Sequence, residues 1–134
     1  LKAMKQHGIW VEVTTLIIPG LNDEPAELER LAAFVAQALG VETPWHISRF
    51  HPTYKLLDRP PTPVATLKRA RYIGLAAWLR YVYLGNAPGQ GGENTVCAGC
   101  GETVIDRGGF SIKGYRIEKG RCRVCNAPVD GVEL

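Results

Sequence analysis

The stretch GIWVEVTTLIIPG, residues 8–20, determines the fold expected from the sequence. It is rich in β-branched residues and ends at Pro-Gly, which together predict a strand followed by a turn. Its apolar character is almost continuous, as in a parallel strand that is covered on both faces. The two alternating sets are Val11, Val13, Thr15 and Ile17 on one face and Trp10, Glu12, Thr14, Leu16 and Ile18 on the other. Only the second set contains a charged residue.

Helices and strands alternate after this strand. Asn22 or Asp23 is expected to cap a helix that has Pro25 in its first turn and stops at Gly40. The stretch WHISRF, residues 45–50, predicts the second strand.

A second helix is expected after an irregular loop that is rich in proline. Thr62 would cap this helix, and Pro63 would lie in its first turn. Its buried face is expected to comprise Val64, Leu67, Leu75, Trp78 and Leu79. The stretch YVYLGN, residues 81–86, predicts a short third strand.

This order of elements predicts an α/β fold with parallel strands and right-handed crossovers. Three strands make an incomplete sheet, which fits either the end of a doubly wound sheet or the last units of a (βα)₈ barrel. Periodicity does not separate these two folds. We expect these units to occupy residues 1–86, a Gly-rich linker to follow at 87–94, and a small β-rich module to occupy 95–134.

The composition is that of an ordinary globular protein, with 46% hydrophobic and 22% charged residues. A net charge of +3 is too small to indicate a nucleic-acid partner by itself. No apolar run reaches the roughly 18 residues of a membrane span, and the first residues are not typical of a signal peptide. We therefore expect no membrane partner and a cytoplasmic location. Because the chain starts with Leu1, we also expect it to be a piece of a longer polypeptide.

The four cysteines form two Cys-x-x-Cys pairs, Cys97/Cys100 and Cys122/Cys125. Such pairs can place four thiolates tetrahedrally around one ion, so they predict a structural zinc in a zinc-ribbon-like module. A mononuclear iron and two redox-active dithiols are the alternatives. Four thiolates would fill every coordination position, so the site is expected to brace the module rather than to catalyse.

The spacer between the two pairs has few apolar residues, namely Val104, Ile105, Phe110, Ile112, Tyr115 and Ile117. They form too small a core to fold alone, so metal binding is expected to supply much of the module's stability.

Basic residues crowd the same module, and they raise an alternative role as a binding module for RNA or a protein. They are Lys113, Arg116, Lys119, Arg121 and Arg123, and their charge is diluted by Asp106, Glu118, Asp130 and Glu133. A basic face on such a module is more often solvated surface, so nucleic acid is the less favoured partner.

Polar residues gather where the predicted strands end. Ligands of parallel α/β folds lie at the carboxyl ends of the strands, here residues 14–22, 48–54 and 83–86. A strand with His46 and Ser48 on one face is unlike a strand buried in a core. These polar side chains are better explained if that face borders a ligand cavity.

Three polar residues in or near these segments also have structural explanations. His51 could be a loop histidine that bonds a backbone carbonyl, which the sequence alone slightly favours. Glu12 and Thr14 could equally form a polar network within the fold.

Several motifs together resemble the C-terminal part of a radical S-adenosylmethionine (radical SAM) enzyme. They are VTTLIIPGLND, HISRFHP and YVYLGNAPG, followed by ENTVCAGCG and RCRVCNAPV. The chain is similar in particular to the radical SAM member of the AmmeMemoRadiSam system, a relative of the pyruvate formate-lyase activating enzymes. The resemblance covers essentially the whole chain, and the YLGN-x-PG strand end followed by two Cys pairs is its most specific part.

The resemblance implies a partial or full TIM-type barrel that holds S-adenosylmethionine and a [4Fe-4S] cluster. The reduced cluster would cleave S-adenosylmethionine to a 5′-deoxyadenosyl radical, which abstracts a hydrogen atom from the substrate. His51 corresponds to the residue that contacts the nucleoside part of the cofactor. Thr14, Leu16 and Ser48 correspond to inward, cofactor-facing positions, and Tyr54, Lys55 and Asn86 are substrate-side candidates.

One departure from the family is decisive for activity. The family holds its cluster with Cys-x-x-x-Cys-x-x-Cys, and this chain has no such triplet. We therefore expect the chain to be inactive alone and to need the missing N-terminal half, in the same polypeptide or as a split partner. A protein substrate is among the partners that the resemblance implies.

Overall fold

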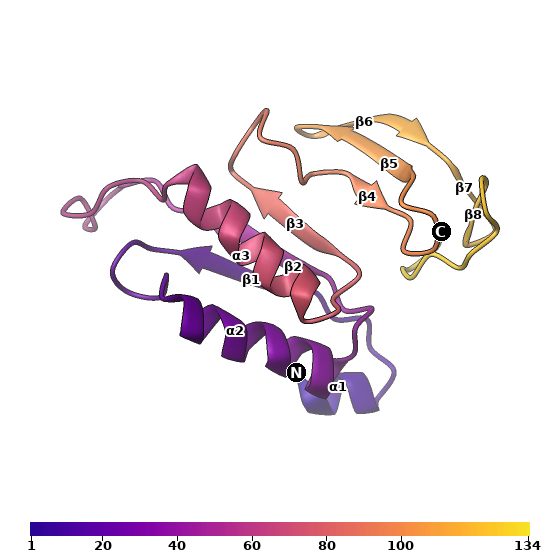
Figure 1. Cartoon of the computed structure of the whole chain (residues 1–134), viewed down its shortest axis with the longest axis horizontal. Coiled ribbons are helices and arrows are strands. Elements are labelled where there is room, and N and C mark those ends of the chain that lie inside the picture. The colour runs from indigo at the N-terminus through magenta and orange to yellow at the C-terminus, as the bar shows by residue number, and fades with distance from the viewer.

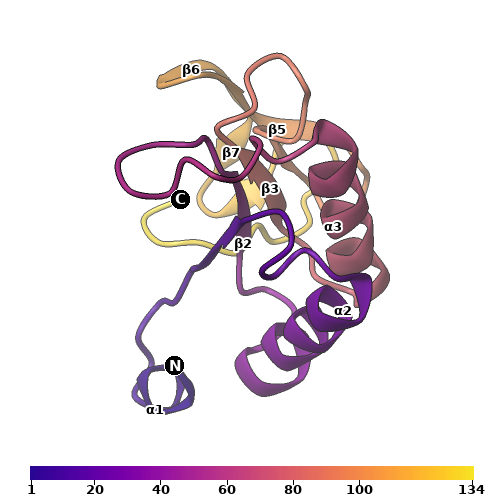
Figure 2. The same cartoon turned by 90° about the vertical axis from the view of Figure 1, so that its left-hand side faces the viewer.

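A computed structural model describes all 134 residues of the chain (Figure 1). Residues 1–87 contain four helical segments and three strands with one hydrophobic core, and residues 95–134, the Cys module, contain five short strands. The two parts lie side by side, and the Cys module lies beyond β3 (Figures 1 and 2).

The N-terminal part is built on one parallel sheet with the strand order β1-β2-β3. Its strands are β1 (Val13–Ile17), β2 (Trp45–Arg49) and β3 (Val82–Gly85), and both pairs run parallel. The predicted parallel pairing is therefore confirmed. In this register Thr14, His46 and Tyr83 form one row across the sheet.

Two long helices cover the same face of the sheet, α2 (Pro25–Phe34) and α3 (Val64–Ala76) (Figure 2). One buried core joins the helices to that face, and its largest fully buried side chain is Trp45. The opposite face has no helix on it, and it carries the set that contains Glu12, with Thr14 and Leu16 exposed to solvent.

The predicted fold class, β/α units of a TIM-type barrel, is wrong. The parallel sheet is open, and the other two sheets, with orders β4-β5-β6 and β7-β8, are antiparallel. A (βα)₈ barrel closes only when eight tilted strands return to the first. Three strands with helices on one face form instead a small mixed α/β fold.

The start of α2 differs from the prediction because two side chains fold back on the preceding turn. Asn22 accepts a hydrogen bond from Ile18 N at 2.7 Å, and Asp23 accepts one from Gly20 N at 2.7 Å. Glu24 is the N-terminal flanking residue and makes no side-chain cap, whereas Pro25 lies in the first turn as predicted.

The second half of the predicted helix is a π-helix, η1 (Val35–Leu39), in which Gly40 N bonds to Val35 O at 3.1 Å. Gly40 ends it with φ = 108°, a conformation that favours glycine. The predicted stop is therefore confirmed.

Thr62 does not cap α3. Pro63 flanks the helix without a side-chain bond, and the buried Thr62 hydroxyl accepts a hydrogen bond from Phe50 N at 2.9 Å and donates one to Ile17 O. Thr62 thus ties the end of β1 to the end of β2.

The predicted buried face of α3 is correct only in part. Leu67 and Leu79 are buried, but Leu75 is half-exposed and Trp78 is 82% exposed, just after the helix. Gly74 takes the inner position, because a Cβ there would lie 2.9 Å from the Trp45 ring. The large Trp45 ring therefore leaves room only for glycine at this position of α3.

The Cys module consists of β4 (Thr95–Val96), β5 (Thr103–Gly108), β6 (Ser111–Tyr115), β7 (Ile117–Glu118) and β8 (Arg121–Cys122). Its separate core comprises Cys97, Val104, Ile105, Ile117, Cys122 and Val129. Phe110, Ile112 and Tyr115 are exposed, so the expectation that they belong to this core is wrong.

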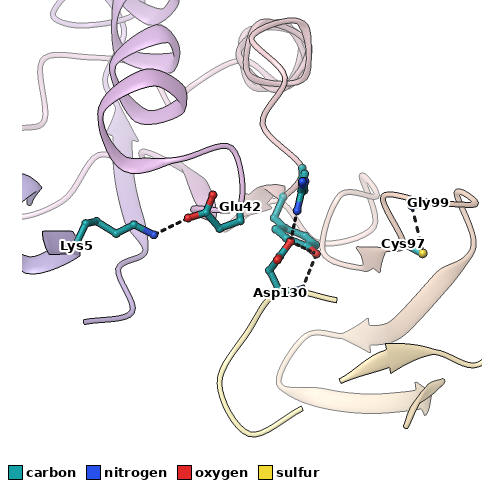
Figure 3. Close-up of polar contacts among 7 residues, drawn as sticks. Lys5, Glu42, Cys97, Gly99 and Asp130 are labelled. Atoms are coloured by element: carbon teal, nitrogen blue, oxygen red, sulfur yellow. Dashed lines mark hydrogen bonds and ion pairs between the residues drawn. The ribbon is translucent and has the colours of Figure 1, made fainter. Parts of the chain in front are cut away.

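A short helix that the sequence did not predict, α1 (Lys2–Gln6), precedes β1. Lys5 anchors it through an ion pair of 2.8 Å with Glu42, in the loop after η1 (Figure 3). None of the helices combines the length and hydropathy that crossing a bilayer requires.

Candidate metal centre and strand-end cluster

The four cysteines converge at one end of the Cys module. Their sulfur atoms all lie within 4.8 Å of one another. Across the two pairs, Cys97 Sγ lies 3.6 Å from Cys125 Sγ, and Cys100 Sγ lies 3.8 Å from Cys122 Sγ. Four thiolates that bind one zinc at about 2.3 Å in a tetrahedron stand about 3.8 Å apart. The donor set and its spacing therefore fit a metal ion.

The two Cys-x-x-Cys turns have the same backbone geometry. In each turn, the amide two residues after the first cysteine donates to that cysteine's sulfur at 3.4 Å. Gly99 donates to Cys97 (Figure 3), and Val124 donates to Cys122. In each turn, the residue after the second cysteine has positive φ, 78° at Gly101 and 61° at Asn126.

Backbone amides favour the thiolate form of Cys122. Hydrogen bonds from the amides of Cys125 and Val124 lower its pKa to about 7, against an ordinary value of 9.0. A metal ligand must lose its proton, so such amides assist metal binding.

The second turn is packed closely against the first. A Cβ on Gly99 would lie 2.7 Å from Ala127 Cβ and 3.4 Å from Cys125 Sγ. Gly99 therefore allows the two turns to approach as closely as four shared ligands require.

The predicted cofactor-contacting residues lie on the uncovered face of the sheet or directly after it. Leu16 and Ser48 share a row of the register with Gly85, and Thr14 lies one row earlier on the same face. Asn86, which follows β3, donates to Ser48 Oγ at 3.1 Å. The rim of the sheet therefore brings together Leu16, Ser48 and Asn86, which are far apart in the sequence. We call these residues, together with His51, the strand-end cluster.

His51 joins this strand-end cluster from the loop after β2. Its Nε2 lies 3.4 Å from the carbonyl oxygen of Asn86, and its ring is exposed. Asn86 has φ = 56°, a conformation that is unusual for a residue other than glycine and is often found at functional sites. The contact with a carbonyl is the structural role considered for His51, and its exposed ring remains open to a ligand.

The other substrate-side candidates do not join the cluster through any hydrogen bond. Tyr54 is 80% exposed, and Lys55 lies over the Tyr54 ring at 5.3 Å. These two residues form a separate exposed pair on the loop.

The uncovered face also carries a polar network that the sequence indicated only in part. Glu12 Oε2 lies 2.8 Å from His46 Nε2, and the His46 ring stacks on Tyr83 with 5.0 Å between centroids. Tyr83 OH lies 2.9 Å from Thr95 Oγ1, which also accepts a hydrogen bond from Arg107. Alternation along the strands could indicate Glu12 and His46, but nothing local indicated that Arg107 of the Cys module would lie beside Tyr83 and bond Thr95.

Asp130 makes a second contact between the two parts of the chain. It accepts hydrogen bonds from Arg80 at 2.8 Å and from Tyr81 OH at 3.1 Å (Figure 3). The backbone amide of Asp130 donates to Tyr81 OH at 3.0 Å. The position of the Cys module beside the sheet is therefore fixed by polar contacts at two points.

The comparisons with known proteins give one relative and no family. The chain is 49% identical over 131 residues to an uncharacterized protein of Methanocaldococcus jannaschii. The match covers 96% of this chain and 39% of the relative, so the chain spans about two fifths of the relative's length. No protein-family profile matches the chain. No solved structure matches it.

Proposed function

We propose that the chain is the C-terminal part of a radical S-adenosylmethionine enzyme. In this role it contributes contacts to the cofactor from the strand-end cluster and a structural metal site from the Cys module. The observation that carries the proposal is the meeting of Leu16, Ser48 and His51 around Asn86, at the carboxyl ends of parallel strands. These are the positions to which the family's motifs correspond, and this is the edge where ligands of parallel sheets bind.

The cluster residues have the chemistry that a nucleoside needs. Ser48 and Asn86 offer a hydroxyl and an amide for hydrogen bonds to a ribose or a base, and Leu16 offers an apolar contact. The exposed imidazole of His51 can stack on or bond to a base. S-adenosylmethionine, when bound, supplies the reactive adenosyl group, and these residues would orient its nucleoside part.

The iron–sulfur cluster of such enzymes does not fit the residues of this chain. All four cysteines converge on one site in the Cys module, and that site leaves no cysteine for a second one. No step through the cluster can be assigned to residues described here. The proposal therefore requires cluster ligands from a further polypeptide segment and predicts no radical chemistry from this chain alone.

Zinc is the ion that the Cys site suits best. Four cysteine thiolates with a tetrahedral spacing and backbone N–H···S bonds are typical of structural zinc. Such a site offers no open position to a substrate, and its role in the enzyme is to hold the strands and turns of the Cys module together.

The test uses the full-length polypeptide with its cluster in place. Replacing His51 by alanine is expected to weaken S-adenosylmethionine binding about tenfold or more, as loss of a good contact does, while iron and sulfide content stay constant. Binding is measured by calorimetry, and His7→Ala serves as a matched control, because His7 lies in the exposed turn after α1.

Two results would overturn the proposal. One is equal affinity for S-adenosylmethionine in the wild type and the His51→Ala variant. The other is a full-length sequence without a Cys-x-x-x-Cys-x-x-Cys motif combined with salt-sensitive RNA binding by the Cys module, which would favour the role of a binding module.

A further inference from the structure

A cleft of about 700 Å³ lies between the uncovered face of the sheet and the Cys module. His46 and Tyr83 line it from the sheet, and Arg107 and Phe110 line it from the module. Its volume is in the range of small-molecule sites, about 300–1,000 Å³. The strand-end cluster shares only Asn86 and Gly85 with this cleft, which extends away from the rim towards Trp10 and Glu12.

Glu12 and His46 form a carboxylate–imidazole pair in the cleft. Glu12 Oε2 lies 2.8 Å from His46 Nε2, and Glu12 Oε1 accepts a hydrogen bond from Trp10 Nε1 at 3.0 Å. Partial burial acts to raise the pKa of Glu12, but these two hydrogen bonds and the charges of His46 and Arg107 outweigh it and lower the pKa. Glu12 is therefore an anion at neutral pH.

This pairing fixes the tautomer of the neutral imidazole. An ionised carboxylate can only accept, so Nε2 of His46 must carry the proton. The lone pair is then on Nδ1, which makes no hydrogen bond within the protein. The His46 side chain is 35% exposed and the Glu12 side chain 48%, so a ligand in the cleft can reach the pair.

A positive charge completes the arrangement on the other wall. The Arg107 guanidinium lies 5.5 Å from the centroid of the Tyr83 ring, and the His46 ring lies 5.0 Å from the same centroid. Arg107 binds Glu93 O and Thr95 Oγ1 through one nitrogen, Nη1, which leaves its other N–H groups for a ligand. A base and a cation thus lie beside the same aromatic ring.

The geometry points to a general-base site, in which His46 Nδ1 takes a proton from a small uncharged ligand and Arg107 stabilises the anion that remains. The proton moves from a C–H, N–H or O–H group of the ligand to Nδ1, and the bonding pair stays on the ligand. Glu12 is a positioning residue that stabilises the resulting imidazolium. This inference does not depend on the proposed function.

The charges in the cleft favour an uncharged ligand over an anion. Glu12 and Glu93 both line it and would repel an anion, while Asp130 is already paired with Arg80. The titratable groups that contact His46 are Glu12 and the Tyr83 phenol, and the guanidinium of Arg107 lies beside the same Tyr83 ring.

The first test determines the tautomer of His46 by nitrogen NMR in the whole chain. The expected result is a proton on Nε2 and a free Nδ1 in the neutral imidazole. This preference should be lost in Glu12→Ala and kept in Glu12→Gln, whose amide oxygen still accepts the hydrogen bond. A proton on Nδ1 in the wild type, or an unchanged preference in Glu12→Ala, would overturn the inference.

The second test uses 5-nitrobenzisoxazole, an uncharged carbon acid, as the probe. A base removes its ring C–H proton, the N–O bond breaks with its electron pair on oxygen, and a nitrile and a phenolate form. The chain should accelerate this elimination about tenfold or more over His46→Ala, and Arg107→Met should retain only part of the gain. His7→Ala is the matched control and should keep the full rate. Equal rates for the wild type and His46→Ala would refute a base at this position.

Discussion

The carboxylate of Asp130 lies 2.8 Å from the guanidinium of Arg80, and this ion pair joins the Cys module to the end of the loop before β3. The same carboxylate accepts a hydrogen bond from Tyr81 OH. Tyr81 is buried between the two parts of the chain, and burial is the main cause that raises its pKa to about 12. The junction is therefore sensitive to alkaline pH.

The free energy of unfolding should decrease as the pH rises from 10.0, the ordinary pKa of tyrosine, towards about 12. In this window the unfolded chain releases the Tyr81 proton more readily than the folded chain, so deprotonation favours unfolding. Urea unfolding at several alkaline pH values measures this loss. Tyr81→Phe should make the decline shallower but not abolish it, because burial also raises the pKa of Tyr83. An unchanged decline in Tyr81→Phe would contradict the assignment.

Metal removal should unfold the Cys module and leave the parallel sheet folded. The module's core has six buried residues, two of which are the ligands Cys97 and Cys122, and it is separate from the core under the sheet. Hydrogen exchange after chelation should show loss of protection in residues 95–134 and continued protection in β1, β2 and β3. Simultaneous loss in both parts would show that the cores are coupled.

The purified chain should contain one equivalent of zinc, and Cys122→Ser should release it. Removal of one thiolate opens a tetrahedral site that has no other cysteine to replace it. Elemental analysis of both proteins measures the metal. Iron and sulfide in stoichiometric amounts would contradict a structural zinc.

Two glycines next to the ligands should respond differently to substitution. Gly99→Ala should weaken metal affinity, because its Cβ would lie 2.7 Å from Ala127 Cβ. Gly101→Asn should be nearly neutral, because Asn126 occupies the equivalent position of the other turn with positive φ and no atom lies within 4 Å of a Cβ at Gly101. Competition with a chromophoric chelator measures both affinities. Equal affinities in the two variants would refute the packing argument.

Thr62→Val should destabilise the chain by about 1–3 kcal/mol, the cost of leaving a buried hydrogen-bonding group without a partner. The change keeps the volume of the side chain but removes the acceptor for Phe50 N and the donor to Ile17 O. Thr62→Ser keeps the hydroxyl and should lose less. Urea unfolding measures both values, and a larger loss in Thr62→Ser would show that the methyl group matters more than the hydroxyl.

Local patterns predicted the parallel strands and the meeting of the four cysteines. Alternation along β1 separated the buried Ile17 from the exposed Leu16, because each face of a strand meets one environment. Cys-x-x-Cys spacing is equally local, since one turn sets the distance between its two sulfur atoms.

Features that depend on distant residues were predicted poorly. Thr62 has the sequence signature of a helix cap, but its hydroxyl bonds Phe50 and Ile17 instead, and only the folded loop shows this. Trp78 fits a helical apolar stripe, yet it follows the end of α3 with φ = 70° and is exposed to solvent. The prediction of a barrel was wrong for a related reason. Alternating strands and helices determine how adjacent strands pair, but closure of the sheet into a barrel depends on the number of strand–helix units.

The open sheet has a practical consequence for handling the protein. No strand pairs with the outer edge of β1, and such an edge is a template onto which another extended chain can add. The isolated chain should therefore self-associate as its concentration rises, and a lysine in place of the exposed Leu16 should keep it monodisperse.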